Sequence, residues 1–257
     1  MLNKSHIFKY FFIREIKNDY LANLLGLTWL FIQPIVLLLM YWFVFEKIFN
    51  ARIPEELNLE FIVYLAVGFW PWLAFSESVV KSISSVMKNS ELIGKNKIDF
   101  KILVLASVSA TFLVNSISYF VILTILSFFY DFLSLEKILL LFIPLFLLYF
   151  FAVSIGLFLS ATQVFVKDTL QVITTFMTLL FFSTPIIYSE LLIPEKYINY
   201  LKYNPLYTPI TFIHNIFINQ ELLPWQSIAY LAVVIVVLIF ISVRYFDKLS
   251  VHFEEYK

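Results

Sequence analysis

Residue types that catalyse reactions or bind metals are few and scattered along this chain of 257 residues. The chain has no cysteine, which excludes disulfides, thiol catalysis and thiolate metal sites. Its three histidines, His6, His214 and His252, lie too far apart in the sequence to suggest a metal cluster. The chain has four glycines, and none of them belongs to a Gly-x-x-x-x-Gly-Lys-Ser/Thr pattern, so the sequence contains no nucleotide-binding loop of this type. We therefore expect no metal, no cofactor and no catalytic residue in this chain.

The composition is that of an integral membrane protein. Apolar residues make up 61% of the chain, charged residues 14%, and the mean hydropathy is +0.88. Soluble domains have about 45–50% apolar and about 25% charged residues, and rarely expose large apolar patches. Since 18 basic residues balance 18 acidic ones, there is no net basic field to attract nucleic acid. These figures disfavour a soluble enzyme, a disordered chain and a nucleic-acid binder.

The apolar residues form runs that match the length of a transmembrane helix, about 20 residues. The runs are uninterrupted rather than alternating, which argues against a β-barrel. The first begins after a charged leader and is too long for a signal-peptide core, so we expect it to be retained. The sequence thus predicts an all-α membrane protein with six transmembrane helices: Tyr20–Phe45, Phe61–Ser76 (extendable to Val80), Ile102–Tyr130, Ile138–Val166, Thr169–Ser189 and Leu222–Val243.

The distribution of Lys and Arg predicts the orientation of these spans. Thirteen of the 18 basic residues fall in the N-terminal segment, the connections after the second and fourth spans, and the C-terminus. Cytoplasmic segments carry an excess of Lys and Arg. We therefore expect a multi-pass protein of the cytoplasmic (inner) membrane with both termini in the cytoplasm.

Three segments outside the spans have their own character. Residues 1–24 carry apolar side chains at every fourth position from Phe8 to Leu24, which predicts a cytoplasmic amphipathic helix in the membrane interface, or alternatively a solvated leader. Residues 82–101 predict a short cytoplasmic helix, ended by Gly94, that docks in a protein groove or serves as a basic anchor. Residues 190–221 are too apolar for a loop and too rich in proline for a crossing, which predicts short external re-entrant or interfacial helices.

The interiors of the spans lack Asp, Glu, Lys and Arg, with Glu77 the nearest candidate. Ion-driven transporters usually need such residues at membrane depth. Any active transport therefore needs energy from a partner. Aromatic residues, which make up 19% of the chain, form either the ordinary interfacial belt or a lining on which sugar rings stack.

Several segments together resemble the ABC-2-type permeases of polysaccharide exporters. The N-terminal part of the chain resembles that of the family at Arg14-Glu15-Ile16-Lys17-Asn18-Asp19-Tyr20, at Leu25-Gly26-Leu27-Thr28-Trp29 and at Pro34. Later matches are Asn89-Ser90-Glu91-Leu92-Ile93, Lys167-Asp168, Ser183-Thr184-Pro185-Ile186-Ile187-Tyr188 and Asn204-Pro205-Leu206. These matches follow the family order over nearly the whole chain.

The resemblance implies a half-transporter formed by one transmembrane domain over residues 1–257. Two copies would form the channel as a homodimer, and two copies of a separate ABC ATPase, which binds ATP and Mg, would move lipid-linked polysaccharide such as O-antigen or capsule outward. Residues expected to couple to the ATPase are Asn89, Ser90, Glu91, Leu92, Ile93 and Gly94, with Arg14, Lys17 and Tyr20 on the interfacial helix. Structural roles are expected for Pro34, Pro185, Asn204 and Pro205, and the substrate path is expected along Tyr41, Trp42, Phe45, Phe181, Phe182, Tyr188, Tyr203 and Tyr207.

Other functions stay open from the residues alone. An exporter of small hydrophobic drugs or lipids would share the six spans and the ATPase but would need a small apolar pocket. A membrane enzyme acting on lipid-linked sugars would need paired carboxylates in a cleft, and the spacing of Glu77, Asp99 and Asp168 does not single them out. A stand-alone channel would keep its function without an ATPase.

Overall fold

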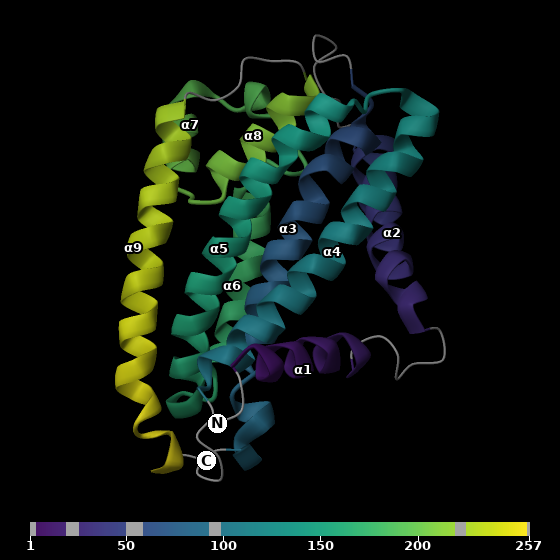
Figure 1. The fold of residues 1–257 in the computed structure, drawn as a ribbon. Helices are drawn as coiled ribbons and strands as arrows, with labels where there is room; N and C mark the ends of the chain where they lie inside the picture. Colours follow the sequence, from purple (N-terminus) through teal and green to yellow (C-terminus); the bar gives the residue numbers. More distant parts are fainter. Residues whose placement is uncertain (1–3, 19–25, 50–58, 93–98, 219–224, 256–257) are drawn as a thin grey trace.

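The computed structural model describes residues 4–18, 26–49, 59–92, 99–218 and 225–255. Within these ranges the chain forms helices and no strand, and Figure 1 shows long helices side by side with one helix lying across one end. The α-helices are α1 (Lys4–Ile16), α2 (Trp29–Trp42), α3 (Phe61–Ile83), α4 (Lys101–Tyr130), α5 (Leu135–Phe165), α6 (Thr169–Ser183), α7 (Glu195–Lys202), α8 (Tyr207–Ile218) and α9 (Trp225–Ser250). Short helical segments are η2 (Gly26–Thr28), the π-helix η3 (Phe43–Ile48), η5 (Met87–Leu92), η6 (Glu190–Leu192) and η7 (Phe253–Glu255).

Five helical segments of the described residues are long and apolar enough to cross a membrane: Phe31–Ile48, α3, α4, α5 and α9. This confirms an all-helical, multi-pass membrane protein. The predicted span Thr169–Ser189 is helical only in α6, which has 15 residues and ends at Ser183. Thr184 is extended there (φ −105°, ψ 138°), because Pro185 disfavours the helical conformation of the residue before it. A sixth crossing therefore stays a prediction.

Helix α3 is the centre of the bundle. In the most apolar stretch of α3, 78% of residues are buried, compared with 22% in that of α9. The mean hydropathy of the α3 stretch (1.3) is nevertheless only half that of the α9 stretch (2.6). In a membrane the lipid-facing helices are the most apolar, while inner helices use small and weakly polar residues to pack closely. Accordingly, α3 buries Gly68, Ala74, Ser78 and Ser82. Helix α5 packs closely against α3 at Gly156, where a Cβ atom would lie 2.6 Å from Ser82 Oγ.

Helix α1 lies across the end of the bundle near the start of α4 and the end of α9 (Figure 1). Its Phe11 packs with Leu103 and Ala106 of α4 in a small apolar cluster. A helix is thus present over Lys4–Ile16, within the predicted 1–24 segment, whereas Tyr20 and Leu24 lie outside the described residues. Its place at the membrane interface stays a prediction.

The described part of the 82–101 segment contains one short helix, in 3₁₀ rather than α-helical form. After α3 the chain forms a turn and then the 3₁₀ segment η5, in which Asn89 leaves helical geometry (φ −113°). Three side chains hydrogen-bond to backbone oxygens here, each at 2.7 Å: Ser82 to Val79, Ser85 to Ser82, and Asn89 to Ser85. Such local bonds compete with the α-helical ladder and explain the shorter turns. Ile93 and Gly94 lie outside the described residues.

The 190–221 segment forms the short helices η6, α7 and α8, as its proline-rich and apolar sequence predicts. These helices lie at the end of the bundle opposite to α1 (Figure 1). Residues 219–221 lie outside the described ranges.

Candidate functional site

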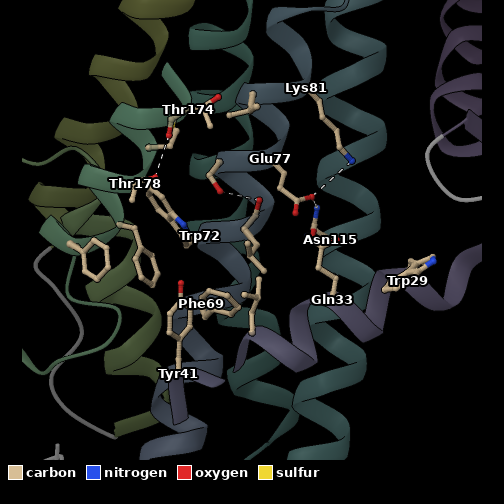
Figure 2. A pocket seen from close by; sticks show the side chains of 17 residues that line it. Trp29, Gln33, Tyr41, Phe69, Trp72, Glu77, Lys81, Asn115, Thr174 and Thr178 are labelled. Atoms are coloured by element: carbon tan, nitrogen blue, oxygen red, sulfur yellow. Dashed lines mark hydrogen bonds and ion pairs between the residues drawn. The ribbon is translucent and has the colours of Figure 1, made fainter. Parts of the chain in front are cut away.

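A groove of about 770 Å³ opens between α2, α3, α4 and α6, and Figure 2 shows the side chains that face it. Each helix contributes one face. On α2 the lining residues follow one another at every fourth position, which places them in a single stripe. The lining consists of Trp29, Gln33, Leu37, Tyr41, Phe69, Trp72, Leu73, Ser76, Glu77, Val80, Lys81, Asn115, Thr174, Met177, Thr178, Phe181 and Phe182.

One end of the groove is aromatic. The rings of Tyr41 and Phe181 stack with centroids 5.6 Å apart, and the Phe69 ring meets the Tyr41 ring edge-on at 5.5 Å. Trp72 lies 5.8 Å from Phe181, and Phe182 is 52% exposed. Phe69, Trp72 and Phe181 are buried, so Tyr41, which is half-buried, and Phe182 are the rings that a ligand can reach. An exposed ring face can hold a flat, weakly polar surface such as the C–H face of a sugar.

The other end of the groove is polar. The Glu77 carboxylate lies 4.0 Å from the Lys81 ammonium and accepts a hydrogen bond of 3.1 Å from the Asn115 amide of α4. The Asn115 amide also donates to the Thr111 carbonyl at 3.1 Å, which orients it. Figure 2 shows the Glu77 carboxylate between the side chains of Lys81 and Asn115. Both charged side chains are about one-third exposed, so the pair contributes little to stability and remains accessible to a ligand.

Only three of the eight residues predicted to line a path face this groove: Tyr41, Phe181 and Phe182. Phe45 packs beside Tyr41 with ring centroids 6.2 Å apart, and Trp42 lies under the Lys47 ammonium. The other three tyrosines do not line the groove and lie beyond its aromatic end, in or next to the segment that forms η6, α7 and α8. The Tyr188 hydroxyl donates to the Phe182 carbonyl, Tyr203 is 85% exposed, and Tyr207 is buried and donates to Glu190.

Two of the quoted sequence motifs meet near α1. The Arg14 guanidinium donates a hydrogen bond to the Asn89 side-chain oxygen, which ties α1 to η5. Arg14 also lies 3.8 Å from Glu15 and stands over the Phe11 ring at 4.6 Å. Lys17 is exposed, and Tyr20 lies outside the described residues. The two expected functional segments, the amphipathic helix and the coupling motif, are therefore joined by one charge-assisted contact.

Two further motifs meet at the opposite end. The Asn204 amide donates to Thr184 Oγ1 at 2.9 Å and to the Ser183 carbonyl at 3.3 Å. Its side-chain oxygen accepts from the Leu206 amide at 3.0 Å. Asn204 thus fixes the start of α8 to the end of α6. Pro185 is buried beside this contact and Pro205 is exposed, while Pro34 lies within α2.

A buried polar cluster holds α8 against α3. The His214 ring stacks on the Tyr64 ring at 3.9 Å, and its Nε2 lies 3.2 Å from the Tyr64 carbonyl oxygen. The Tyr64 hydroxyl in turn donates to the Tyr188 carbonyl at 3.0 Å. Burial lowers the pKa of His214 to about 3, so its ring is neutral at physiological pH. Burial and the Glu190 carboxylate raise the pKa of Tyr207.

Sequence reasoning missed most of the groove. Phe69, Trp72, Glu77 and Asn115 were not predicted as lining residues, although Glu77 was identified as the charged residue nearest to the interior of a span. The available signal was helical spacing: Trp72, Ser76, Val80 and their neighbours repeat at three and four residues along α3. The sequence gives no indication of which face of α3 meets α6.

Comparisons with known proteins agree with this architecture. The sequence model of the ABC-2 type transporter family matches residues 6–218. An O-antigen export system permease protein RfbA of Klebsiella pneumoniae is 26% identical over 94% of this chain and 91% of its own length. An RfbA of Myxococcus xanthus is 26% identical over 94% and 92%. The polysialic acid transport protein KpsM of Escherichia coli is 23% identical over 90% and 88%.

Proposed function

Because the chain belongs to the ABC-2 type transporter family, we propose that it is the transmembrane subunit of an ATP-driven exporter that moves lipid-linked polysaccharide outward across the cytoplasmic membrane. It is a multi-pass membrane protein that works with an ABC ATPase and is not itself an enzyme. The relatives named for O-antigen export and polysialic acid transport, which match along nearly their whole length, support the polysaccharide class of substrate.

The groove between α2, α3, α4 and α6 is the observation that carries this substrate class. Its aromatic end offers Tyr41 and Phe182 to the C–H faces of sugars, and its polar end offers Glu77 and Lys81 to hydroxyl groups. Stacking on rings does not require one particular sugar, which suits a polymer that must slide. A site for small hydrophobic drugs would lack the charged end, because burying an ion pair against an apolar ligand is costly.

Coupling to the ATPase is assigned to residues 89–94. In this proposal the ATPase binds ATP and Mg, and this chain binds neither. Two copies of the chain form the channel, and two ATPase copies bind at the end of the bundle where α1 and η5 lie. The Arg14–Asn89 hydrogen bond supports a joint role for α1 and the coupling motif, since movement of η5 strains α1 directly.

Six crossings with both termini in the cytoplasm fit the positions of the helix ends. Phe165 at the end of α5 lies 6.1 Å from Phe253, which follows α9, so α5 and α9 end at the same end of the bundle. The chain must therefore return to the opposite end between α5 and α9. Helix α6 covers about 22 Å of that path at about 1.5 Å per residue, and the excess of basic residues marks the end near α1 as cytoplasmic.

Co-purification from native membranes tests the proposal. We expect an ABC ATPase to accompany the full-length chain, and lipid-linked glycan, but not small hydrophobic drugs, to stimulate its ATP hydrolysis. Phe182→Ala in the groove should weaken that stimulation, whereas Phe128→Ala, an 85% exposed aromatic of α4 outside the groove, should not. Stimulation by drugs alone would favour the drug exporter, and glycan movement without any ATPase would favour a channel.

A further inference from the structure

The α6 wall of the groove presents hydrogen-bond acceptors whose own protons are already engaged. The Thr174 hydroxyl donates to the Leu170 carbonyl at 2.7 Å, and the Thr178 hydroxyl donates to the Thr174 carbonyl at 3.4 Å (Figure 2). A hydroxyl that donates to its own helix can still accept through its oxygen. Both threonines are exposed and line the groove, so they offer acceptors to a ligand there.

The Glu77 carboxylate is the strongest acceptor in the groove. It has about four lone-pair positions, and it accepts one hydrogen bond of 3.1 Å from Asn115. The Lys81 ammonium lies 4.0 Å away, which is beyond hydrogen-bond distance. Since the Glu77 side chain is one-third exposed, two neighbouring hydroxyl groups of a sugar can donate to it.

The formal charges of the groove cancel. Among the described residues that line it, Glu77 and Lys81 are the charged ones, and they form an ion pair. A carboxylate or phosphate of a ligand would therefore meet a negative and a positive group together and gain little attraction. It would also lose hydration water, which is costly without a compensating charge between helices of membrane-spanning length.

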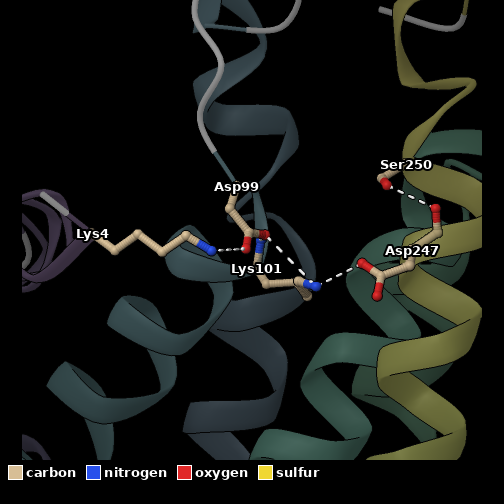
Figure 3. Close-up of polar contacts among 5 residues, drawn as sticks. All are labelled: Lys4, Asp99, Lys101, Asp247 and Ser250. Carbon is tan, nitrogen blue, oxygen red and sulfur yellow. Dashed lines mark hydrogen bonds and ion pairs between the residues drawn. The ribbon is translucent and has the colours of Figure 1, made fainter. Parts of the chain in front are cut away.

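Charges also cancel in a cluster of α1, α4 and α9 at the end of the bundle where α1 lies (Figure 3). The Lys4 ammonium lies 3.2 Å from Asp99, and the Lys101 ammonium lies 2.6 Å from Asp247 and 4.0 Å from Asp99. Two lysines and two aspartates sum to zero. This cluster therefore adds no excess of positive charge that could draw an acidic polymer toward the groove.

We propose that the groove selects an uncharged glycan, rich in free hydroxyl groups, over an acidic one. The inference rests on the proposed function and narrows its class of substrate. Glu77 is then the residue that determines specificity, because it accepts protons from hydroxyl groups and cancels the attraction of Lys81 for anionic groups. Lys81 and the exposed Gln33 supply N–H donors, so both hydrogen-bonding roles of a hydroxyl group are met.

Stimulation of ATP hydrolysis by two matched glycans tests this selectivity. The complex of the full-length chain with its ATPase, in lipid nanodiscs, would receive a lipid-linked mannan, or the same mannan after its primary hydroxyl groups have been oxidised to carboxylates. Both carry the same lipid, so they differ in the polymer alone. We expect the uncharged mannan to give half-maximal stimulation at a concentration about tenfold lower, because its passage requires no desolvation of charge.

Two variants of the ion pair should shift this preference in opposite directions. A unit charge about 10 Å away at an effective dielectric constant of about 20 changes affinity about tenfold. Glu77→Gln leaves the charge of Lys81 uncancelled and should lower the preference about tenfold, through a stronger response to the acidic mannan. Lys81→Gln should raise the preference about tenfold. Lys248→Gln, at an exposed position of α9 outside the groove, should leave it unchanged.

The results that would overturn the inference differ from those that would overturn the proposed function. Equal stimulation by the two mannans, or a stronger response to the acidic one, would refute the selectivity and leave polysaccharide export in place. Shifts of the same sign in Glu77→Gln and Lys81→Gln, or an equal shift in Lys248→Gln, would also refute it. If neither mannan stimulates ATP hydrolysis, the proposed function fails and the inference with it. If Lys81→Gln does not fold, Glu77→Gln still decides, because a misfolded protein cannot gain a response.

Discussion

Substituting Gly68 by alanine should destabilise the protein through a single contact with His214. Gly68 lies inside α3, and a Cβ atom there would lie 2.7 Å from His214 Nε2 and 2.9 Å from Cε1. Carbon atoms in good contact lie about 3.5–4.0 Å apart, so the ring would have to retreat by nearly 1 Å. It cannot do so freely, because it stacks on Tyr64 at 3.9 Å and its Nε2 contacts the Tyr64 carbonyl.

The expected magnitude combines two opposite effects. Forcing an extra methyl group into a packed interior costs about 1–3 kcal/mol. Replacing glycine by alanine within a helix returns up to about 1 kcal/mol, because alanine has the higher helix propensity. We expect a net loss of about 1–2 kcal/mol for Gly68→Ala. In a His214→Ala background the ring is absent, so the same substitution should be neutral or stabilising.

Unfolding by sodium dodecyl sulfate, followed by tryptophan fluorescence of the purified chain, measures this difference. The four proteins of the double-mutant cycle are the unmodified chain, both single variants and the double variant. The expected result is a destabilisation by Gly68→Ala in the unmodified background and none in the His214→Ala background. The same effect in both backgrounds would refute the reasoning, because the destabilisation would then not come from the ring.

Three further predictions concern the contacts at either end of the bundle. The pKa of His214 is about 3 in the fold and about 6.5 in the unfolded chain, so between these values only the unfolded chain takes up a proton. The free energy of unfolding should therefore be highest above pH 6.5 and fall by about 2 kcal/mol from pH 7 to pH 5. His214→Gln should abolish this pH dependence in unfolding measurements. Arg14→Ala should lower ATP-driven export but not membrane insertion, and adding Asn89→Ala should cause little further loss, because both break the same hydrogen bond. Asn204→Ala should lower stability by about 1–2 kcal/mol in thermal unfolding, while Pro205→Ala, at an exposed position, should change it by less than about 0.5 kcal/mol.

The sequence predicted the long helices well because hydrocarbon imposes a simple rule. A segment that faces lipid must be apolar throughout and about 20 residues long, and the predicted spans Ile102–Tyr130 and Ile138–Val166 agree closely with α4 and α5. The rule fails where polar groups find partners inside the protein. It does not describe the 82–101 segment, where the side chains of Ser82, Ser85 and Asn89 bond to the local backbone and the short helix is the 3₁₀ segment η5.

The groove was harder to predict than the helices because it depends on pairing between helices. Tyr41 and Phe181 are 140 residues apart in the sequence, and only the packing of α2 against α3 and α6 brings their rings together. Glu77 was identified from the sequence as the charged residue nearest to the interior of a span, but not as part of a groove. In the fold its carboxylate faces the groove and is held by Asn115 of α4.

Helix α3 links the separate sites through one continuous element. Its first turns hold Tyr64 against His214 of α8, its middle supplies Trp72 and Glu77 to the groove, and its end leads within a few residues into Asn89, which contacts α1. Because α3 is buried on nearly all sides, its neighbours prevent it from bending independently at each site. A displacement of η5 by a bound ATPase would therefore shift α3 largely as a rigid body. Under the proposed function, the wall of the groove and the contact to α8 would move in the same step, which makes the packing at Gly68 and Gly156 as important for transport as the groove itself.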